Sequence, residues 1–187
     1  MTTEDAIREQ AITAIGEYLR ASEICIDTVK SGGGLGYAAT LLLLCAADAI
    51  GHGVLPDNGD FTRLDVLADP LFDQVLSPDQ ARQVKNWYRH LLAHTATMAI
   101  GVHLEPGAQG MPFEFDSMGA PVLIRVGKLH EIVSTAWGRV EKAKFNPPGA
   151  RGKQPDLTAR PLDWGTSLSH AASGVTSILG SASARTP

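Results

Sequence analysis

Three side chains that can carry acid–base or phosphate-binding chemistry lie together between residues 87 and 94. This stretch reads Trp-Tyr-Arg-His-Leu-Leu-Ala-His, and its ionisable members are Arg89, His90 and His94. An unperturbed histidine titrates near neutral pH and can exchange a proton with a reacting group. Arginine keeps its charge and can bind two phosphate oxygens at once. These residue types suit RNA cleavage without a metal, in which a base acts near the 2′-hydroxyl and a cation stabilises the charge on phosphorus.

The same histidines also allow a metal interpretation. His90 and His94 are four residues apart, a spacing that lets two imidazoles on one helix face share a metal ion, with His52 as a third ligand. In outline this arrangement resembles the DinB-like metal bundles. No glutamate lies within the His-x-x-x-His stretch, so the chemistry of zinc peptidases is not indicated. A surface arginine and a boundary histidine without chemical roles would also explain these residues.

The helix that carries this stretch has a clear start signal. Ser77 is the expected N-cap, Pro78 takes the first helical position, and Gln80 completes a capping box. The face that meets the core is predicted from helical spacing as Ala81, Val84, Tyr88, Leu91, Thr95 and Met98. Arg89 and His94 are about 140° apart on a straight helix. They form one site only if the helix bends or ends early, or if a second copy supplies one of them.

Other segments predict the body that holds this helix. Residues 4–29 have helical periodicity, with Thr3 as the expected N-cap. Residues 37–50 are apolar on nearly all sides and predict the central helix, which Gly51, His52 and Gly53 should close. Within this helix Asp48 is the one charged residue, so it should face outward or pair with a buried base.

Glycines and prolines divide the rest of the chain. Gly32 to Gly36 invites comparison with a phosphate-binding loop, but no strand precedes it, and a turn between two helices explains the glycines better. Pro70 should split residues 61–76 into two short helices. Residues 111–125 predict a β-hairpin with the turn Asp-Ser-Met-Gly, and residues 126–142 predict a final helix.

These elements predict a mainly all-α fold. We expect an up-and-down bundle of four to five helices over residues 1–144, with the hairpin as an insertion. Residues 145–187 are rich in Pro, Gly, Ser and Ala and predict a largely flexible tail. Apolar residues within this tail could form a short helix that binds a partner protein.

Composition and charge restrict the function classes. The chain is 44% hydrophobic and 19% charged, as in an ordinary globular protein. Residues 1–137 hold 9 Lys or Arg against 17 Asp or Glu, whereas residues 138–187 hold 7 against 3. The body therefore lacks the broad basic surface that grips long nucleic acid. Two cysteines, Cys25 and Cys45, and no apolar run of about 18 residues predict a cytoplasmic protein with no membrane span.

The order of these elements, with Tyr-Arg-His-Leu-Leu-Ala-His at the end of a helix, resembles the HEPN superfamily of small helical bundles. Its signature is Arg, a polar residue, and His after four to six positions, which Arg89, His90 and His94 match. The resemblance implies a dimer that brings two Arg/His pairs to one cleft and cuts RNA without metal, leaving a cyclic phosphate. Toxin-type members that a partner nucleotidyltransferase modifies carry Tyr two residues after the His, whereas this chain has Ala96.

The sequence therefore leaves three functional hypotheses open. The first is a HEPN-type ribonuclease, or a toxin-like module that binds RNA or nucleotide, acting as a homodimer without a cofactor. The second is a non-catalytic interaction or scaffold bundle whose tail binds a protein partner. The third is the three-histidine metal bundle. None of the three involves a membrane.

Overall fold

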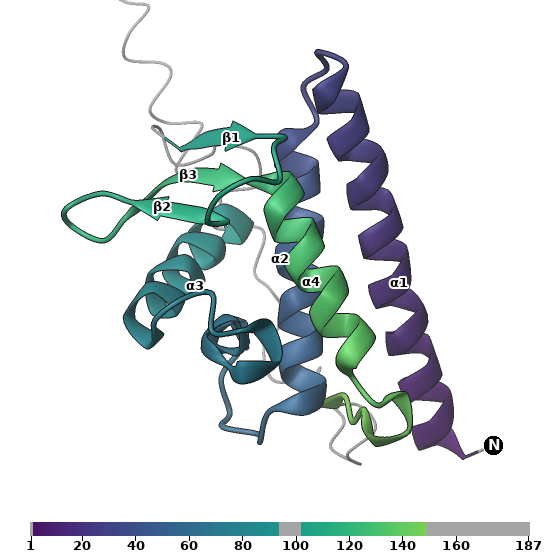
Figure 1. Ribbon diagram of the computed structural model, residues 1–187. Coiled ribbons are helices and arrows are strands. Elements are labelled where there is room, and N and C mark those ends of the chain that lie inside the picture. Colours follow the sequence, from purple (N-terminus) through teal and green to yellow (C-terminus); the bar gives the residue numbers. More distant parts are fainter. Residues whose placement is uncertain (1, 94–101, 149–187) are drawn as a thin grey trace, which may run out of the picture. The chain divides into compact units, whose positions relative to one another are not determined.

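The computed structural model describes residues 2–93 and 102–148, and for residues 89–93 it gives the backbone alone. Within these residues the chain forms four α-helices, three short 3-10 helices and a three-stranded sheet (Figure 1). Helices α1, α2 and α4 run alongside one another, and the sheet lies at one end of them. The predicted mainly helical bundle is thereby confirmed.

Helix α1 (Thr3–Lys30) begins and ends at residues whose chemistry suits those positions. Thr2 is the N-cap: its hydroxyl accepts the Asp5 N–H at 3.1 Å, and the Asp5 carboxylate accepts the Thr2 N–H at 3.1 Å. This reciprocal pair satisfies two of the N–H groups that a helix start leaves without partners. The sequence prediction placed the N-cap one residue too late, at Thr3.

The glycine-rich segment after α1 reverses the chain. Gly32 has a φ of 89°, a left-handed conformation that glycine adopts without steric cost. The Gly33 N–H donates to the Thr28 carbonyl oxygen at 2.9 Å, which closes the end of the helix. The next helix then packs back along α1. The predicted helix-to-helix turn is confirmed.

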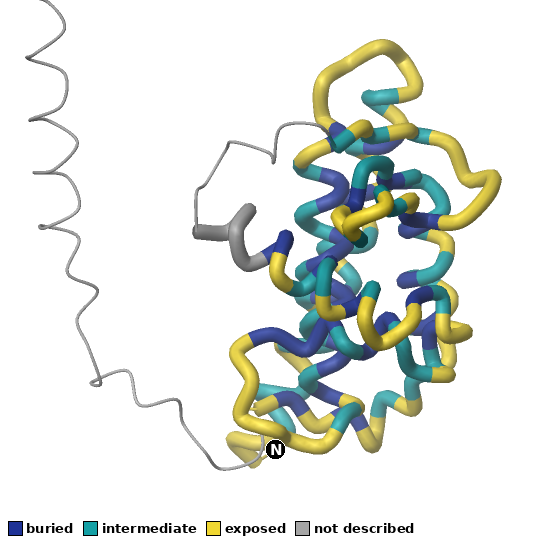
Figure 2. Tube along the Cα trace, turned by 90° about the vertical axis from the view of Figure 1, so that its left-hand side faces the viewer, coloured by how far each residue is buried: buried dark blue, intermediate teal, exposed yellow. Residues whose placement is uncertain are grey.

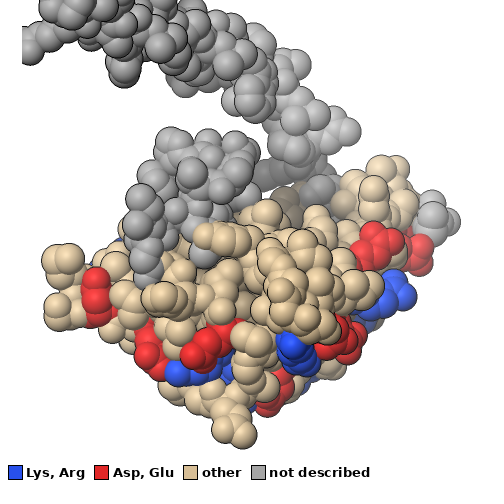
Figure 3. Space-filling model, turned by 90° about the horizontal axis from the view of Figure 1, so that it is seen from above, with Lys and Arg blue, Asp and Glu red and all other residues tan. Residues whose placement is uncertain are grey.

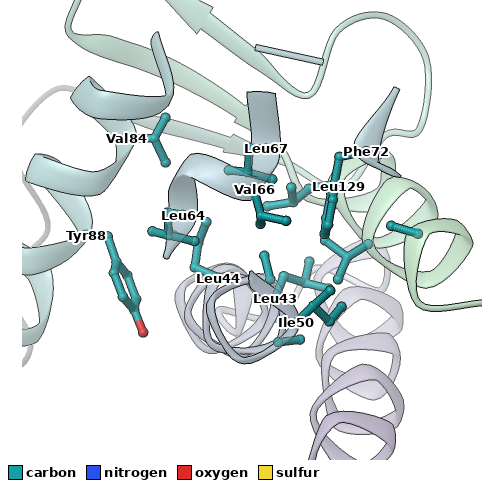
Figure 4. Close-up of a cluster of buried hydrophobic side chains, with 14 of the residues drawn as sticks. Leu43, Leu44, Ile50, Leu64, Val66, Leu67, Phe72, Val84, Tyr88 and Leu129 are labelled. Atoms are coloured by element: carbon teal, nitrogen blue, oxygen red, sulfur yellow. The ribbon is translucent and has the colours of Figure 1, made fainter. Parts of the chain in front are cut away.

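Helix α2 (Gly36–Val54) is the centre of the core. Its buried residues lie on several sides of the helix. In Figure 2 the segments coloured as buried lie mostly inside the body. In Figure 4 the side chains of Leu43, Leu44 and Ile50 meet others from the neighbouring elements. Each apolar side chain of this kind contributes about 1.5–3 kcal/mol when it is fully buried. The predicted central helix is confirmed.

Helix α2 does not end at Gly51, as the sequence suggested, but continues to Val54. A Cβ on Gly51 would lie 2.3 Å from the Arg63 carbonyl oxygen, and one on Gly53 would lie 1.9 Å from the Phe145 ring. These two glycines therefore let other segments approach the helix closely. Sequence inspection cannot separate this use of glycine from its use as a helix terminator.

Two short 3-10 helices follow: η1 (Leu64–Ala68) packs against α2, and η2 (Pro70–Phe72) packs against η1 and the last α-helix, α4 (Val126–Arg139). Pro70 separates them, as predicted, and the Asp69 carboxylate accepts the Leu71 N–H at 2.8 Å. The apolar side chains of η1 are fully buried: Leu64, Val66 and Leu67. They fill the space between α2 and the helix that follows (Figure 4).

Helix α3 (Pro78–Ala93) starts at the predicted capping box. The Ser77 N–H donates to the Gln80 side-chain oxygen at 2.9 Å, and the Gln80 N–H donates to the Ser77 hydroxyl at 3.2 Å. Its buried face, as far as side chains are described, consists of Ala81, Val84, Trp87 and Tyr88. The start was predicted correctly, and so was the burial of Ala81, Val84 and Tyr88. The other predicted members of this face, Leu91, Thr95 and Met98, lie outside the described side chains.

The sheet has the strand order β1-β3-β2. Strands β2 (Phe113–Phe115) and β3 (Pro121–Arg125) are antiparallel and form the predicted hairpin. The Asp116 carboxylate accepts the N–H groups of Met118 and Ala120 across the turn. Strand β1 (His103–Glu105) pairs in parallel with β3 and was not predicted, because three residues are too few for a periodic signal.

Strand β3 runs directly into helix α4 (Val126–Arg139), with no residue between them. The helix ends before residue 142, where it was predicted to end. The Lys142 ammonium donates to the carbonyl oxygens of Trp137 and Val140 and lies 3.5 Å from the centre of the Trp137 ring. A cation is favourable at a helix C-terminus, where the carbonyl groups carry partial negative charge.

The packed body includes the residue after the third 3-10 helix, η3 (Lys142–Lys144). Phe145 is 1% exposed, and its ring packs edge-on against the Trp137 ring, with 5.3 Å between the ring centroids. Its carbonyl oxygen accepts a hydrogen bond of 2.7 Å from the Arg8 guanidinium group of α1. The body thus extends past residue 144, which was the predicted boundary. Residues 149–187, most of the predicted tail, lie outside the described residues.

The close approach at Gly51 predicts a specific loss of stability. Gly51→Ala should lower the free energy of unfolding by about 1–3 kcal/mol, because the Arg63 backbone must move to admit a methyl group. The matched control is Gly138→Ala in α4, where a Cβ meets nothing within 4 Å. That change should raise stability by about 0.5–1 kcal/mol through helix propensity. Denaturant unfolding of both variants checks the pair, and equal effects would contradict it.

Candidate functional site

The predicted site residues lie at the end of α3 and in the segment that follows. The backbone of Arg89 and His90 is helical and belongs to the last five residues of α3. Their side chains, and all of His94, lie outside the described residues. The structure therefore establishes the helix that leads into the motif, while the arrangement of the three ionisable groups stays a prediction.

Tyr88, directly before Arg89, is anchored in the core. The residue is 2% exposed, and in Figure 4 its ring extends from α3 beside α2. A hydrogen bond of 3.2 Å joins its hydroxyl to the Cys45 thiol of α2. Buried tyrosines keep their hydroxyl groups paired in this way, because an unpaired one costs the full desolvation of the group.

Cys45 belongs to a polar strip of α2 that also includes Asp48 and His52. Their spacing of three and four residues puts them on one side of the helix. The Asp48 side chain is 18% exposed and accepts the backbone N–H of Arg63 at 2.5 Å. The His52 Nε2 atom lies 3.8 Å from the same carboxylate oxygen. Asp48 was predicted to face outward or pair with a base, and its observed partner is a backbone N–H from a distant segment.

The charge of Asp48 is only partly compensated. Burial raises the pKa of this carboxyl, because a charged group loses hydration there. The hydrogen bond from the Arg63 N–H lowers its pKa, and so do the charges of His52 and Lys85. The nearby Asp65 carboxylate raises it. The burial contribution is the largest, so the folded protein holds this proton more tightly than an unfolded chain does.

The pair formed by Tyr88 and Cys45 stays neutral at physiological pH. Burial is the main cause that raises the pKa of each group. The negative charge of Asp48 raises both values further, because a second anion beside it would be repelled. The thiol is therefore a hydrogen-bonding partner and not an activated nucleophile, which would require a lowered pKa.

A buried arginine organises the segment that crosses α2. The Arg63 side chain is 5% exposed and donates to the Pro56 carbonyl oxygen at 2.5 Å. It also binds both oxygens of the Asp65 carboxylate, at 3.1 and 3.0 Å. This two-point pairing satisfies the planar guanidinium group. Sequence reasoning did not find this residue, because no spacing relates Arg63 to the atoms that it binds.

An ion pair ties α3 to the loop before η1. The Lys85 ammonium lies 2.6 Å from the Asp60 carboxylate. Lys85 is four residues before Arg89, and residues four apart are neighbours on one face of a helix. The sequence contained both charges, but nothing in it indicated that the loop folds back to meet α3.

His52, the third ligand in the metal interpretation, has contacts of its own. Besides Asp48, its Nε2 atom lies 3.3 Å from the Phe61 carbonyl oxygen. Among residues 2–93 and 102–148, as far as side chains are described, no group of three or more His, Cys, Asp or Glu residues is placed to hold a metal ion. The site expected from His52, His90 and His94 includes residues outside that set, so it stays a prediction.

Most cationic side chains in the described part of the chain pair with acids. Arg125 pairs with Glu105 at 3.1 Å and with Glu114, and Arg139 pairs with Asp73 at 2.7 Å. On the face seen in Figure 3, acidic and basic atoms lie beside one another and do not gather in one basic patch. Local pairing of this kind leaves little positive field for steering a long polyanion.

Among the helices that the structure describes, α2 alone is long and apolar enough to cross a membrane by length and composition. Half of this stretch is buried inside the protein. The central helix of a helical bundle has the same properties, because its neighbours cover it. The composition of α2 therefore carries no argument for a membrane.

Comparisons of the chain with protein-family models, curated proteins and solved structures find no match. The class of the protein is thus defined by its fold alone: a mainly helical bundle with a three-stranded sheet at one end. The described polar contact nearest to the predicted motif is the hydrogen bond between Cys45 of α2 and Tyr88 of α3.

The raised pKa of Asp48 predicts a pH-dependent effect of Asp48→Asn. An asparagine oxygen can still accept the Arg63 N–H but carries no charge. Unfolded aspartates titrate near pH 3.9, about as model peptides do. Because the folded protein retains the Asp48 proton above that pH, wild-type stability should fall relative to the variant as pH rises from about 4 to 7.

Denaturant unfolding of the wild-type protein and of Asp48→Asn at several pH values measures this difference. Effects of titratable groups that do not interact with Asp48 cancel, since both proteins contain them. A stability difference that stayed constant, or that grew in favour of the wild type with rising pH, would contradict the proposed burial of this charge.

Proposed function

We propose that this chain is a HEPN-type bundle that cleaves RNA without a metal, using Arg89, His90 and His94. The observation that carries the proposal is the course of α3. Its start is capped by Ser77, its buried face packs on the core, and its helical backbone continues through Arg89 and His90 to Ala93. The motif therefore begins within a helix that packs on the core of the bundle.

The chemistry asked of these residues is a transesterification. His94 accepts the proton of the 2′-hydroxyl while the 2′-oxygen bonds to phosphorus. The bond from phosphorus to the 5′-oxygen breaks, and a second acid, for which His90 is the candidate, returns a proton to that oxygen. Arg89 binds the phosphate oxygens, on which negative charge grows during the step. The products are a 2′,3′-cyclic phosphate and a free 5′-hydroxyl.

A homodimer solves the geometric problem within the motif. Positions 89 and 94 are about 140° apart on a straight helix, so one helix does not aim both side chains at one phosphate. Two copies related by a twofold axis bring the same surface of each chain together. Each site would then take Arg89 from one subunit and His94 from the other.

The activity is tested with the purified full chain and an RNA oligonucleotide in excess EDTA. Wild type should produce cyclic phosphate ends. Arg89→Ala and His94→Ala should each lower the rate at least about a hundredfold, since each removes a group that acts in the transition state. Arg82→Ala is the control, because Arg82 is an exposed α3 residue paired with Asp79. Cleavage that survives both substitutions would contradict the proposal.

Subunit mixing tests whether the sites are shared. Arg89→Ala and His94→Ala chains are unfolded together and refolded as a mixture. Half of the dimers are then mixed, and each mixed dimer has one intact shared site and one without either group. The mixture should regain about a quarter of the wild-type rate, as follows from twofold symmetry. If each site came from one chain, the mixture would be as inactive as its components.

A further inference from the structure

The last described side chain of α3 before the motif is that of Tyr88. Two other polar interactions stabilise this helix: the capping box formed by Ser77 and Gln80, and the ion pair between Lys85 and Asp60. Both lie earlier in the helix. The hydrogen bond from Tyr88 to Cys45 is thus, among the described side chains, the tie nearest to Arg89.

Residues 89–93, the last described part of α3, follow this contact directly. Local opening of a helical turn costs little free energy where few contacts hold it. A buried ring resists rotation of the helix through packing, but packing alone tolerates small shifts along the interface. A hydrogen bond between two buried groups adds a directional constraint, because its strength falls when the atoms move apart or out of line.

The thiol and the phenol suit this task because neither ionises near neutral pH. Burial raises the pKa of both groups, so the contact persists over the range in which histidines gain and lose protons. The residues around this contact are also fixed: Asp48 is held by the Arg63 N–H, on the same strip of α2. The anchor therefore keeps its geometry while neighbouring groups titrate.

We infer that Tyr88 is a positioning residue, whose hydrogen bond to Cys45 holds residues 89–93 of α3 and thereby aligns Arg89 for RNA cleavage. The structural half of this inference concerns the helix end alone. The catalytic half rests on the proposed ribonuclease function. The two halves can be measured separately.

The opening of residues 89–93 is measured as the rate of amide hydrogen exchange in the full-length protein. Tyr88→Phe and Cys45→Ala each remove one partner of the hydrogen bond. We expect amides 89–93 to exchange about tenfold faster in both variants, while amides near the capped start of α3 keep their rates. Cys45→Ser restores a hydroxyl partner and should keep exchange within about twofold of wild type.

Thr40→Val is the matched control. It removes another buried side-chain hydrogen bond of α2, in which the Thr40 hydroxyl donates to the Gly36 carbonyl oxygen at 2.9 Å. It should leave amides 89–93 unchanged even if it lowers the melting temperature. Unchanged exchange in Tyr88→Phe and Cys45→Ala would overturn the inference. Equal acceleration in Cys45→Ser and Cys45→Ala would also overturn it, because lost volume would then be the cause.

The catalytic half is measured by RNA cleavage with the same variants. Tyr88→Phe should lower kcat about tenfold and change KM less than twofold, because a misaligned Arg89 loses its hold on the charge that develops in the transition state. Unchanged kcat with accelerated exchange would overturn the catalytic half. A wild-type protein that does not cut RNA would refute the proposed function, and the exchange result would then still decide the role of Tyr88 at the helix end.

Discussion

The burial of α2 is the constraint on which the other elements depend. Helices α1 and α4 and the short helix η1 all pack against it, and α3 reaches it through η1 and through Tyr88. A helix that is apolar on most sides has no stable position at a surface, so the chain must surround it. The surrounding segments are not regular everywhere. Where one of them crosses near Gly51, only the absence of a side chain allows the approach.

Within this apolar helix, the polar strip of Cys45, Asp48 and His52 fixes how neighbouring segments are oriented on α2. Apolar packing is tolerant of small rotations, whereas hydrogen bonds and ion pairs are not. Asp48 fixes the crossing segment through the Arg63 N–H, and Cys45 fixes α3 through Tyr88. The cost is a partly buried carboxylate whose charge is incompletely compensated.

The elements that could be predicted are those with local signals. The capping box at Ser77, the break at Pro70 and the glycine turn after α1 depend on residues within one or two turns of each other. Strand β1 and the continuation of α2 depend on partners far along the chain, so no local pattern reveals them. The Arg63 side chain binds nearby loop atoms, but their spacing follows no helix or strand period. The candidate site combines both kinds of information. The helix that carries the site was predicted from the sequence. The hydrogen bond between Cys45 and Tyr88, which joins residues 43 apart, was not.

The direct junction of β3 with α4 has a mechanical consequence. Flexible linkers normally absorb the movement of one element before it reaches the next. Here the backbone passes from Arg125 to Val126 without such a linker, and the Arg125 N–H is itself bonded to the Pro112 carbonyl oxygen of the hairpin. The direction of the hairpin strand is therefore set by the direction of α4, which is packed against α1 and α2. A displacement of the hairpin relative to the bundle requires a change in the backbone dihedral angles at Arg125 and Val126.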